Sequence, residues 1–190
     1  LLMPTYLLLA LLFIVPEFYR PLNSEQAIYI ILRISVVTIL LPGISISILK
    51  LTGYIKNVHL ENRQDRLWPY LFTSLYYGVL CYIFIRSMSF HSFLVIMGSM
   101  TTLILLLAFI NFKIKVSAHA AAISGALGFL WALKMMDPEM QILYPIAIVI
   151  FVIGIVMWAR LKLNAHRPIE IYLGALLGFL TCYLGVLFFM

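Results

Sequence analysis

The chain has 190 residues, of which 64% are hydrophobic and only 11% are charged, and its mean hydropathy is +1.08. A soluble domain of this size cannot bury so much apolar surface, so the composition excludes one and indicates an all-α polytopic membrane protein. The formal net charge of +6 is typical of loop charges that set topology, or of an anionic headgroup as partner. No basic face lies free of the bilayer, which argues against a nucleic-acid partner.

The apolar runs predict the positions of the membrane spans. A spanning helix needs about 20 residues, so we expect one integral-membrane domain over residues 1–190, a transmembrane helical bundle of about six to seven spans. The predicted spans are Leu1–Val15, Ala27–Leu51, Leu67–Ile85, Phe93–Ile110, Ala120–Met136, Ile142–Trp158 and Ile169–Phe189. Pro42 and Gly43 predict a kink in the second span. Arg33 in that span is either a functional charge or a side chain that extends toward a loop.

Small residues are concentrated in two of these spans. The span Ala120–Met136 is short and rich in alanine and glycine, and the last span contains Gly174 and Gly178, four residues apart. Small residues at this spacing let the backbones of neighbouring membrane helices approach closely. We therefore expect close helix packing at both spans, which by itself indicates nothing about function.

Three polar loops interrupt the spans, at Gly53–Arg66, Lys113–His119 and Ala159–Glu170. Because two spans separate each loop from the next, all three loops must face the same side of the membrane. They contain three of the four histidines, namely His59, His119 and His166. Basic and titratable groups that converge at one end of a helical bundle form a candidate anion-binding site.

The last polar loop carries Arg160, His166 and Glu170. If a helix begins near Pro168, Glu170 lies in its first turn and its carboxylate can reach the His166 imidazole. Such a carboxylate fixes the tautomer and orientation of a histidine that acts as a base or nucleophile, and a nearby guanidinium suits phosphate. Alone, this stretch would be interpreted as a basic loop at the membrane surface. A functional site is favoured because a second polar loop, Lys113–His119, also contains a histidine.

The middle loop adds Ser117 and His119 at the start of a span. Ser117 is a candidate N-cap, and the free N–H groups of a first helical turn, together with the helix dipole, favour phosphate. His119 in that turn can donate a proton to a leaving oxygen. The alternative for His119 is an interfacial histidine that is hydrogen-bonded to a loop carbonyl.

The three loops together resemble the three motifs of the type 2 phosphatidic acid phosphatase superfamily, which includes integral-membrane lipid phosphatases. The motif Ser-Arg-x5-His-x3-Asp is matched by Ala159, Arg160, His166 and Glu170. The motif Pro-Ser-Gly-His is matched by Val116, Ser117, Ala118 and His119. The motif Lys-x6-Arg-Pro is matched by Lys56, Arg63 and Gln64, with Arg66 as a competing candidate for the arginine. The resemblance covers roughly residues 50–190.

The chain departs from these motifs at several positions. Glu170 in place of Asp lengthens the orienting arm by one methylene group, and Ala159 in place of Ser removes a hydroxyl contact. Ala118 in place of Gly restricts a backbone that wraps closely around phosphate. Val116 and Gln64 replace the two motif prolines. These departures bear on activity more than on fold.

The resemblance implies a set of residue roles. His166 would attack phosphorus, Glu170 would orient His166, and His119 would protonate the leaving alkoxide. The implied phosphate ligands are Lys56, Arg63, Ser117 and Arg160, with Arg66 and Lys115 as further candidates. We expect no metal and no cofactor, because the few carboxylates and widely spaced histidines do not form a metal-binding pattern.

The expected function is therefore a metal-independent membrane phosphatase that hydrolyses a lipid phosphate or pyrophosphate through a phosphohistidine. The alternative is a catalytically impaired relative that acts as a lipid-phosphate binding protein or carrier, and the replaced Pro, Gly and Ser positions and Arg33 favour it. A structural membrane subunit is a third possibility, but it leaves the grouped histidines unexplained.

The side of the membrane that carries the site is indicated by two opposing arguments. The shared loop face holds nine basic residues, namely Lys50, Lys56, Arg63, Arg66, Lys113, Lys115, Arg160, Lys162 and Arg167, whereas the opposite face holds Arg20, Arg86 and Lys134. The positive-inside rule then favours the cytoplasm. Lipid phosphatases of the resembled superfamily commonly work on the outer face, however. We expect a bacterial inner-membrane protein whose site lies on the external face.

Overall fold

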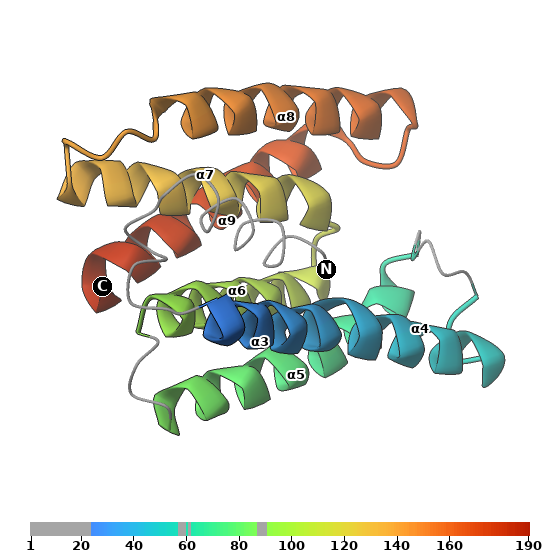
Figure 1. Cartoon of the computed structure of the whole chain (residues 1–190). Coiled ribbons are helices and arrows are strands. Elements are labelled where there is room, and N and C mark those ends of the chain that lie inside the picture. Colours follow the sequence, from blue (N-terminus) through green and yellow to red (C-terminus); the bar gives the residue numbers. More distant parts are fainter. Residues whose placement is uncertain (1–23, 57–59, 61, 87–90) are drawn as a thin grey trace.

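The computed structural model describes residues 24–56, 60, 62–86 and 91–190, and this part of the chain is an all-helical bundle (Figure 1). Its elements are α3 (Ser24–Ser35), the π-helix η1 (Val36–Leu40), α4 (Leu41–Leu51), the 3-10 helix η2 (Gln64–Arg66), α5 (Leu67–Arg86), α6 (His91–Asn111), α7 (Ala118–Met136), α8 (Leu143–Lys162) and α9 (Pro168–Phe189). The predicted span over Leu1–Val15 lies outside the described residues.

Six helical segments of the described chain are long and apolar enough to cross a membrane. They are Ile28–Leu51, Gln64–Arg86, Ser92–Asn111, Ala118–Met136, Leu143–Lys162 and Pro168–Phe189. Each coincides with a span predicted from the apolar runs. The protein is therefore a multi-pass integral membrane protein, and the prediction of a polytopic helical bundle is confirmed.

The first of these segments contains a π-helix, η1, shortly before the position of Pro42 and Gly43, where the sequence predicts a kink. Between α3 and α4 the helix widens into η1, where the Leu41 N–H donates to the Val36 carbonyl oxygen in a π-type bond. Pro42 follows directly, and a proline has no N–H to donate to the carbonyl one turn earlier. The fully buried Thr38 donates its hydroxyl to the Ile34 carbonyl oxygen at 2.8 Å. The irregularity therefore takes the form of a π turn that ends just before the proline.

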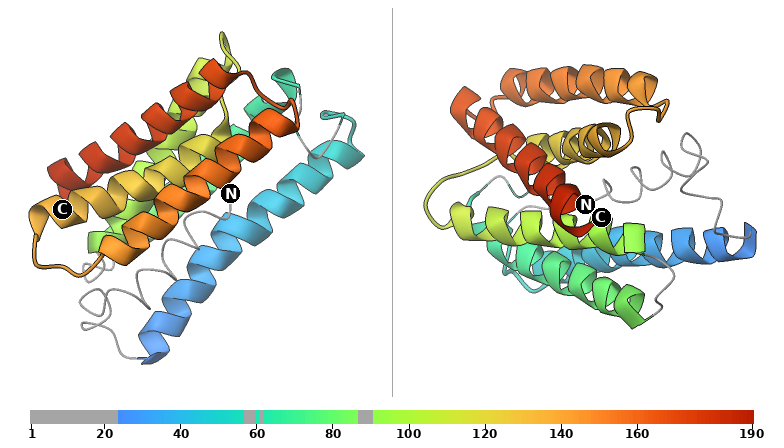
Figure 2. Two further views of the ribbon diagram at one scale, coloured as in Figure 1. Left: turned by 90° about the horizontal axis from the view of Figure 1, so that it is seen from above. Right: turned by 90° about the vertical axis from the view of Figure 1, so that its left-hand side faces the viewer.

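The bundle has two groups of helices that α9 joins. Helices α5 and α6 pack together with α4 alongside, and α8 lies on the outer side of α7 (Figure 1). Helix α9 runs obliquely between the groups, with its most extensive contact on α7 and a second contact on α6 (Figure 2). The buried core includes Tyr77 of α5, Met97 of α6 and Phe129 of α7, so it draws on both groups. Among the described helices, α9 therefore makes the most extensive connection between the two groups.

The contact between α7 and α9 is made by backbone against backbone. A Cβ atom on Gly178 would overlap the backbone of Ala121, and one on Gly128 would overlap the backbone of Phe179. A Cβ on Gly174 would lie only 2.6 Å from the Ser117 carbonyl oxygen. The small residues noted in the sequence thus face each other across one interface, which is the close approach that they permit in membranes.

Replacement of Gly178 by alanine is expected to destabilise the bundle, because the added methyl group meets the Ala121 backbone, which cannot move away independently of α7. Overpacking of this kind costs about 1–3 kcal/mol. Gly154→Ala in α8 is the matched control, since a Cβ there meets nothing within 4 Å. Thermal unfolding in detergent measures the difference. Equal melting temperatures for the two variants would show that α7 and α9 are not in this close contact.

Candidate functional site

The loop before α5 is hydrogen-bonded to the loop before α7. The Arg63 guanidinium donates to the Lys113 carbonyl oxygen at 2.7 Å, and the Asn111 amide donates to the Arg63 carbonyl oxygen at 2.8 Å. Arg66 donates through Nη1 to the Val116 carbonyl oxygen at 3.1 Å. These bonds connect positions about fifty residues apart in the sequence, so they fix the first loop against the second.

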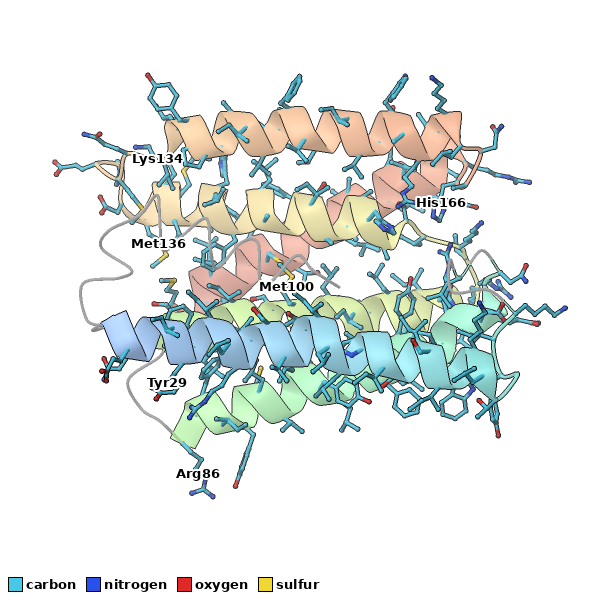
Figure 3. The ribbon with its side chains drawn as sticks, turned by 45° about the vertical axis from the view of Figure 1, so that its right-hand side comes forward. Tyr29, Arg86, Met100, Lys134, Met136 and His166 are labelled. Carbon is cyan, nitrogen blue, oxygen red and sulfur yellow. The ribbon has the colours of Figure 1, made fainter. Side chains whose placement is uncertain are left out.

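The loop before α7 is in turn bonded to the loop before α9. Lys115 Nζ donates to the Ala165 carbonyl oxygen at 2.9 Å, and the Ser117 N–H donates to the Glu170 carbonyl oxygen at 3.1 Å. All three predicted loops therefore meet at one end of the bundle. Figure 3 shows His166 at this end, whereas Tyr29, Arg86 and Lys134 lie at the other.

The start of α9 positions His166 and Glu170. Helix α9 begins at Pro168, Arg167 is its N-cap residue and Glu170 lies in its first turn. The Glu170 carboxylate oxygen Oε2 lies 2.8 Å from His166 Nδ1, and it also accepts a hydrogen bond from the Arg167 N–H at 3.3 Å. The contact predicted from the spacing is confirmed. Because a carboxylate only accepts, Nδ1 carries the proton and Nε2 of a neutral ring is left with a free lone pair.

The surroundings of His166 favour its neutral form. The side chains of His166 and Glu170 are only 4% and 14% exposed. Burial lowers the pKa of His166 below its ordinary value of 6.5, and the positive charges of Arg66 and Lys115 lower it further, while the hydrogen bond and charge of Glu170 oppose the shift. Burial is the largest of these effects. The imidazole is therefore neutral at pH 7 and available as a nucleophile or base.

Ser117 and His119 occupy the start of α7. The buried Ser117 is the N-cap, and its hydroxyl accepts a hydrogen bond from the Ala120 N–H at 3.4 Å, as predicted. His119 follows in the first turn with an exposed side chain. Arg160, His166 and Arg66 all lie near enough to interact with His119 electrostatically. The two histidines thus belong to one cluster, although they come from different loops.

Among the arginines of the first loop, Arg66 rather than Arg63 reaches this cluster. Arg66 is 8% exposed, and besides Val116 its Nε donates to the Leu60 carbonyl oxygen at 2.8 Å. Its charge acts on His119, Arg160 and His166. Arg63 is exposed and turned to Lys113. The competing candidate of the sequence analysis is therefore the one that the fold places beside the histidines.

The remaining predicted phosphate ligands also differ in whether they lie near the histidines. Arg160, in the last turn of α8, is half-buried and interacts with His119 and Arg66. Lys115 lies beside His166. Lys56 is exposed, and its ammonium group makes no hydrogen bond within the described part of the chain. His59 lies outside the described residues. The structure thus places Arg66 near both histidines, Arg160 near His119 and Lys115 near His166, and leaves Lys56 and Arg63 at the periphery.

A surface hollow of about 400 Å³ opens beside this cluster. Its lining consists of Lys115, Leu161, Asn164, Ala165, His166, Arg167, Pro168 and Glu170. Lys115 and Arg167 give it positive charge, which suits an anionic group. Nowhere in the described residues do three His, Cys, Asp or Glu side chains come together as a metal site would require. The ligand for which the cluster is best suited is therefore an anion.

The comparisons with known proteins indicate no function for this chain, so the proposed function is argued from the geometry of the site. No family model matches the chain, and neither a curated protein nor a solved structure matches it.

The protonation of His166 can be tested directly. Its NMR titration midpoint is expected below 6.5, because burial disfavours the imidazolium. Glu170→Gln should lower the midpoint further, since it removes the charge that stabilises the protonated ring. Glu139→Gln, at the opposite end of the bundle, should leave the midpoint unchanged. A midpoint above 6.5, or a rise in Glu170→Gln, would contradict this account of the site.

Proposed function

We propose that this protein is a membrane-embedded phosphatase that hydrolyses a lipid phosphate or pyrophosphate through a phosphohistidine intermediate. The observation that carries the proposal is the 2.8 Å contact between His166 Nδ1 and Glu170, at the edge of a basic hollow and within electrostatic reach of a second histidine. The resemblance of the three loops to the type 2 phosphatidic acid phosphatase superfamily supports the same reaction.

The first step transfers the phosphoryl group to the protein. His166 Nε2 attacks phosphorus while Nδ1–H stays bonded to Glu170, whose charge stabilises the imidazolium that forms. The bond between phosphorus and the ester oxygen breaks. The negative charge of the bound phosphate offsets Arg160 and Arg66 and favours the protonated form of His119, which donates its proton to that oxygen. The lipid then leaves as a neutral alcohol. For a pyrophosphate, the same proton goes to the leaving phosphate.

The second step regenerates the enzyme. His119, now neutral, accepts a proton from water, and the resulting hydroxide attacks the phosphohistidine. The bond between phosphorus and Nε2 breaks, so inorganic phosphate leaves and both histidines return to their first states. Arg66, Arg160 and Lys115 offset the charge that develops on the phosphoryl oxygens. The N-terminal turn of α7, capped by Ser117, adds backbone N–H donors.

The replacement of the motif glycine by Ala118 is compatible with this proposal. In the described chain, the residues other than glycine with positive φ are Leu60 and Asn164. Ala118 therefore has an ordinary backbone conformation that needs no glycine. Ala159 lacks the motif hydroxyl, which favours the alternative of an impaired relative that binds or carries lipid phosphate. Phosphate release decides between the two.

The catalytic test uses purified protein with short-chain phosphatidic acid, phosphatidylglycerophosphate and isoprenyl pyrophosphate. Phosphate release from at least one of them is expected, and His166→Ala should abolish both turnover and the acid-labile phosphoenzyme. His119→Ala should slow release from a lipid by roughly 10²–10⁴-fold. It should slow release from a nitrophenyl phosphate much less, because that leaving group needs no proton.

Two outcomes would overturn the mechanism. Equal loss on the lipid and on the nitrophenyl phosphate in His119→Ala would remove His119 as the general acid. Binding of all three lipids without phosphate release would instead establish the binding or carrier function. Thermal unfolding of each variant serves as the control for folding.

We also propose that the site lies on the external face of a bacterial inner membrane, as the resemblance implies. The three cations around the histidines are needed by a phosphate site on either side, so they do not report topology. Single cysteines at Gln64 and Gln141, both exposed and at opposite ends of the bundle, provide the test in a chain without Cys81 and Cys182. An impermeant thiol reagent applied to intact cells should label Gln64→Cys. Labelling of Gln141→Cys alone would place the site in the cytoplasm.

A further inference from the structure

The lysines of this chain divide into two groups by their contacts. Lys115 donates to the Ala165 carbonyl oxygen, and Lys134 donates to the Met140 carbonyl oxygen at 2.7 Å. The other four are exposed, and their ammonium groups make no hydrogen bond within the described part of the chain. These four residues, which we call the lysine collar, are Lys50, Lys56, Lys113 and Lys162. Their charges are therefore available to a partner outside the protein.

The lysine collar lies entirely at the end of the bundle that carries His119 and His166. Lys50 is in the last turn of α4 and Lys162 is in the last turn of α8. Lys113 follows the end of α6, and Lys56 lies in the loop before α5. Three of the charges thus come from separate helix ends, and the fourth comes from a loop. None of them lines the hollow beside His166, whereas Lys115 and Arg167 do.

Exposed aromatic residues accompany the lysine collar. Trp158 is 60% exposed, and the Lys162 ammonium lies 4.7 Å from the centroid of its ring. Tyr54 and Phe112 are also exposed and lie close in sequence to Lys50 and Lys113. Tryptophan and tyrosine in membrane proteins gather at the depth of the lipid headgroups. The lysines are therefore placed at the depth of the lipid phosphates.

Few acidic groups are available to neutralise the lysine collar. Of the described acidic residues at this end, Glu170 is bonded to His166, and Asp65 accepts from the Asn62 amide at 3.5 Å. Uncompensated lysines next to a membrane attract anionic lipids. We propose that the lysine collar binds the headgroups of anionic phospholipids in the surrounding leaflet, separately from the site at His166. This binding does not depend on the proposed phosphatase activity.

The test measures which lipids surround Trp158. The full chain with Trp68→Phe and Trp131→Phe leaves Trp158 as the fluorescent reporter, and it is reconstituted into phosphatidylcholine vesicles. A minor fraction of the lipid is brominated, as either phosphatidylglycerol or phosphatidylcholine, and bromine quenches a nearby tryptophan. At low salt the anionic lipid is expected to quench roughly threefold more than the neutral one, because each exposed lysine favours it. High salt should reduce this ratio.

Two combined variants decide whether the lysines cause the preference. Changing Lys50, Lys113 and Lys162 to glutamine should bring the quenching ratio close to one, whereas changing the same residues to arginine should preserve it. Each ratio is internal to one variant, so a change in the intrinsic fluorescence of Trp158 cancels. Equal quenching by both lipids in the parent chain would overturn the proposal, and so would an unchanged ratio in the glutamine variant.

Discussion

The backbone hydrogen bond from the Ser117 N–H to the Glu170 carbonyl oxygen is the constraint on which the candidate site depends. It joins the start of α7 to the start of α9, and Gly174 permits it by leaving room for the Ser117 carbonyl group. Two helix N-termini therefore lie side by side at the same end of the bundle. Their dipoles add to the charge of the nearby cations, so the fold itself makes this place favourable for an anion.

Much of this architecture could be predicted from the sequence, because membrane insertion leaves few choices. Apolar runs of about 20 residues must span the bilayer, and their number then decides which loops share a face. The position of Pro168 was sufficient to predict the contact between His166 and Glu170, since a proline favours the first turn of a helix. Ser117 could be predicted as an N-cap because a serine hydroxyl accepts a hydrogen bond from a backbone N–H of the first helical turn.

The sequence could not decide which arginine reaches the histidines. Arg63 is the N-cap of the 3-10 helix η2 and Arg66 is its last residue, and the motif spacing favours Arg63. The choice is made by acceptors in distant parts of the chain. The Val116 carbonyl oxygen takes a hydrogen bond from Arg66, and the Lys113 carbonyl oxygen holds Arg63 at the surface. Long-range contacts of this kind leave no signal in the local sequence. The sequence also could not predict the π turn before Pro42, because a helix can accommodate a proline in several ways.

The pairing of α7 with α9, across the intervening α8, also governs the order in which the protein can be assembled. Helix α7 contacts α9 more extensively than it contacts α8, although α8 is the next helix to be synthesised. Gly125 and Gly128 of α7 therefore gain their packing partner only after α9 has been inserted. Lys115 and Ser117 likewise find their acceptors in the loop before α9 and in the first turn of α9. His119 and His166 consequently come together only after α9 has been inserted, so α7 and α8 alone do not form the site.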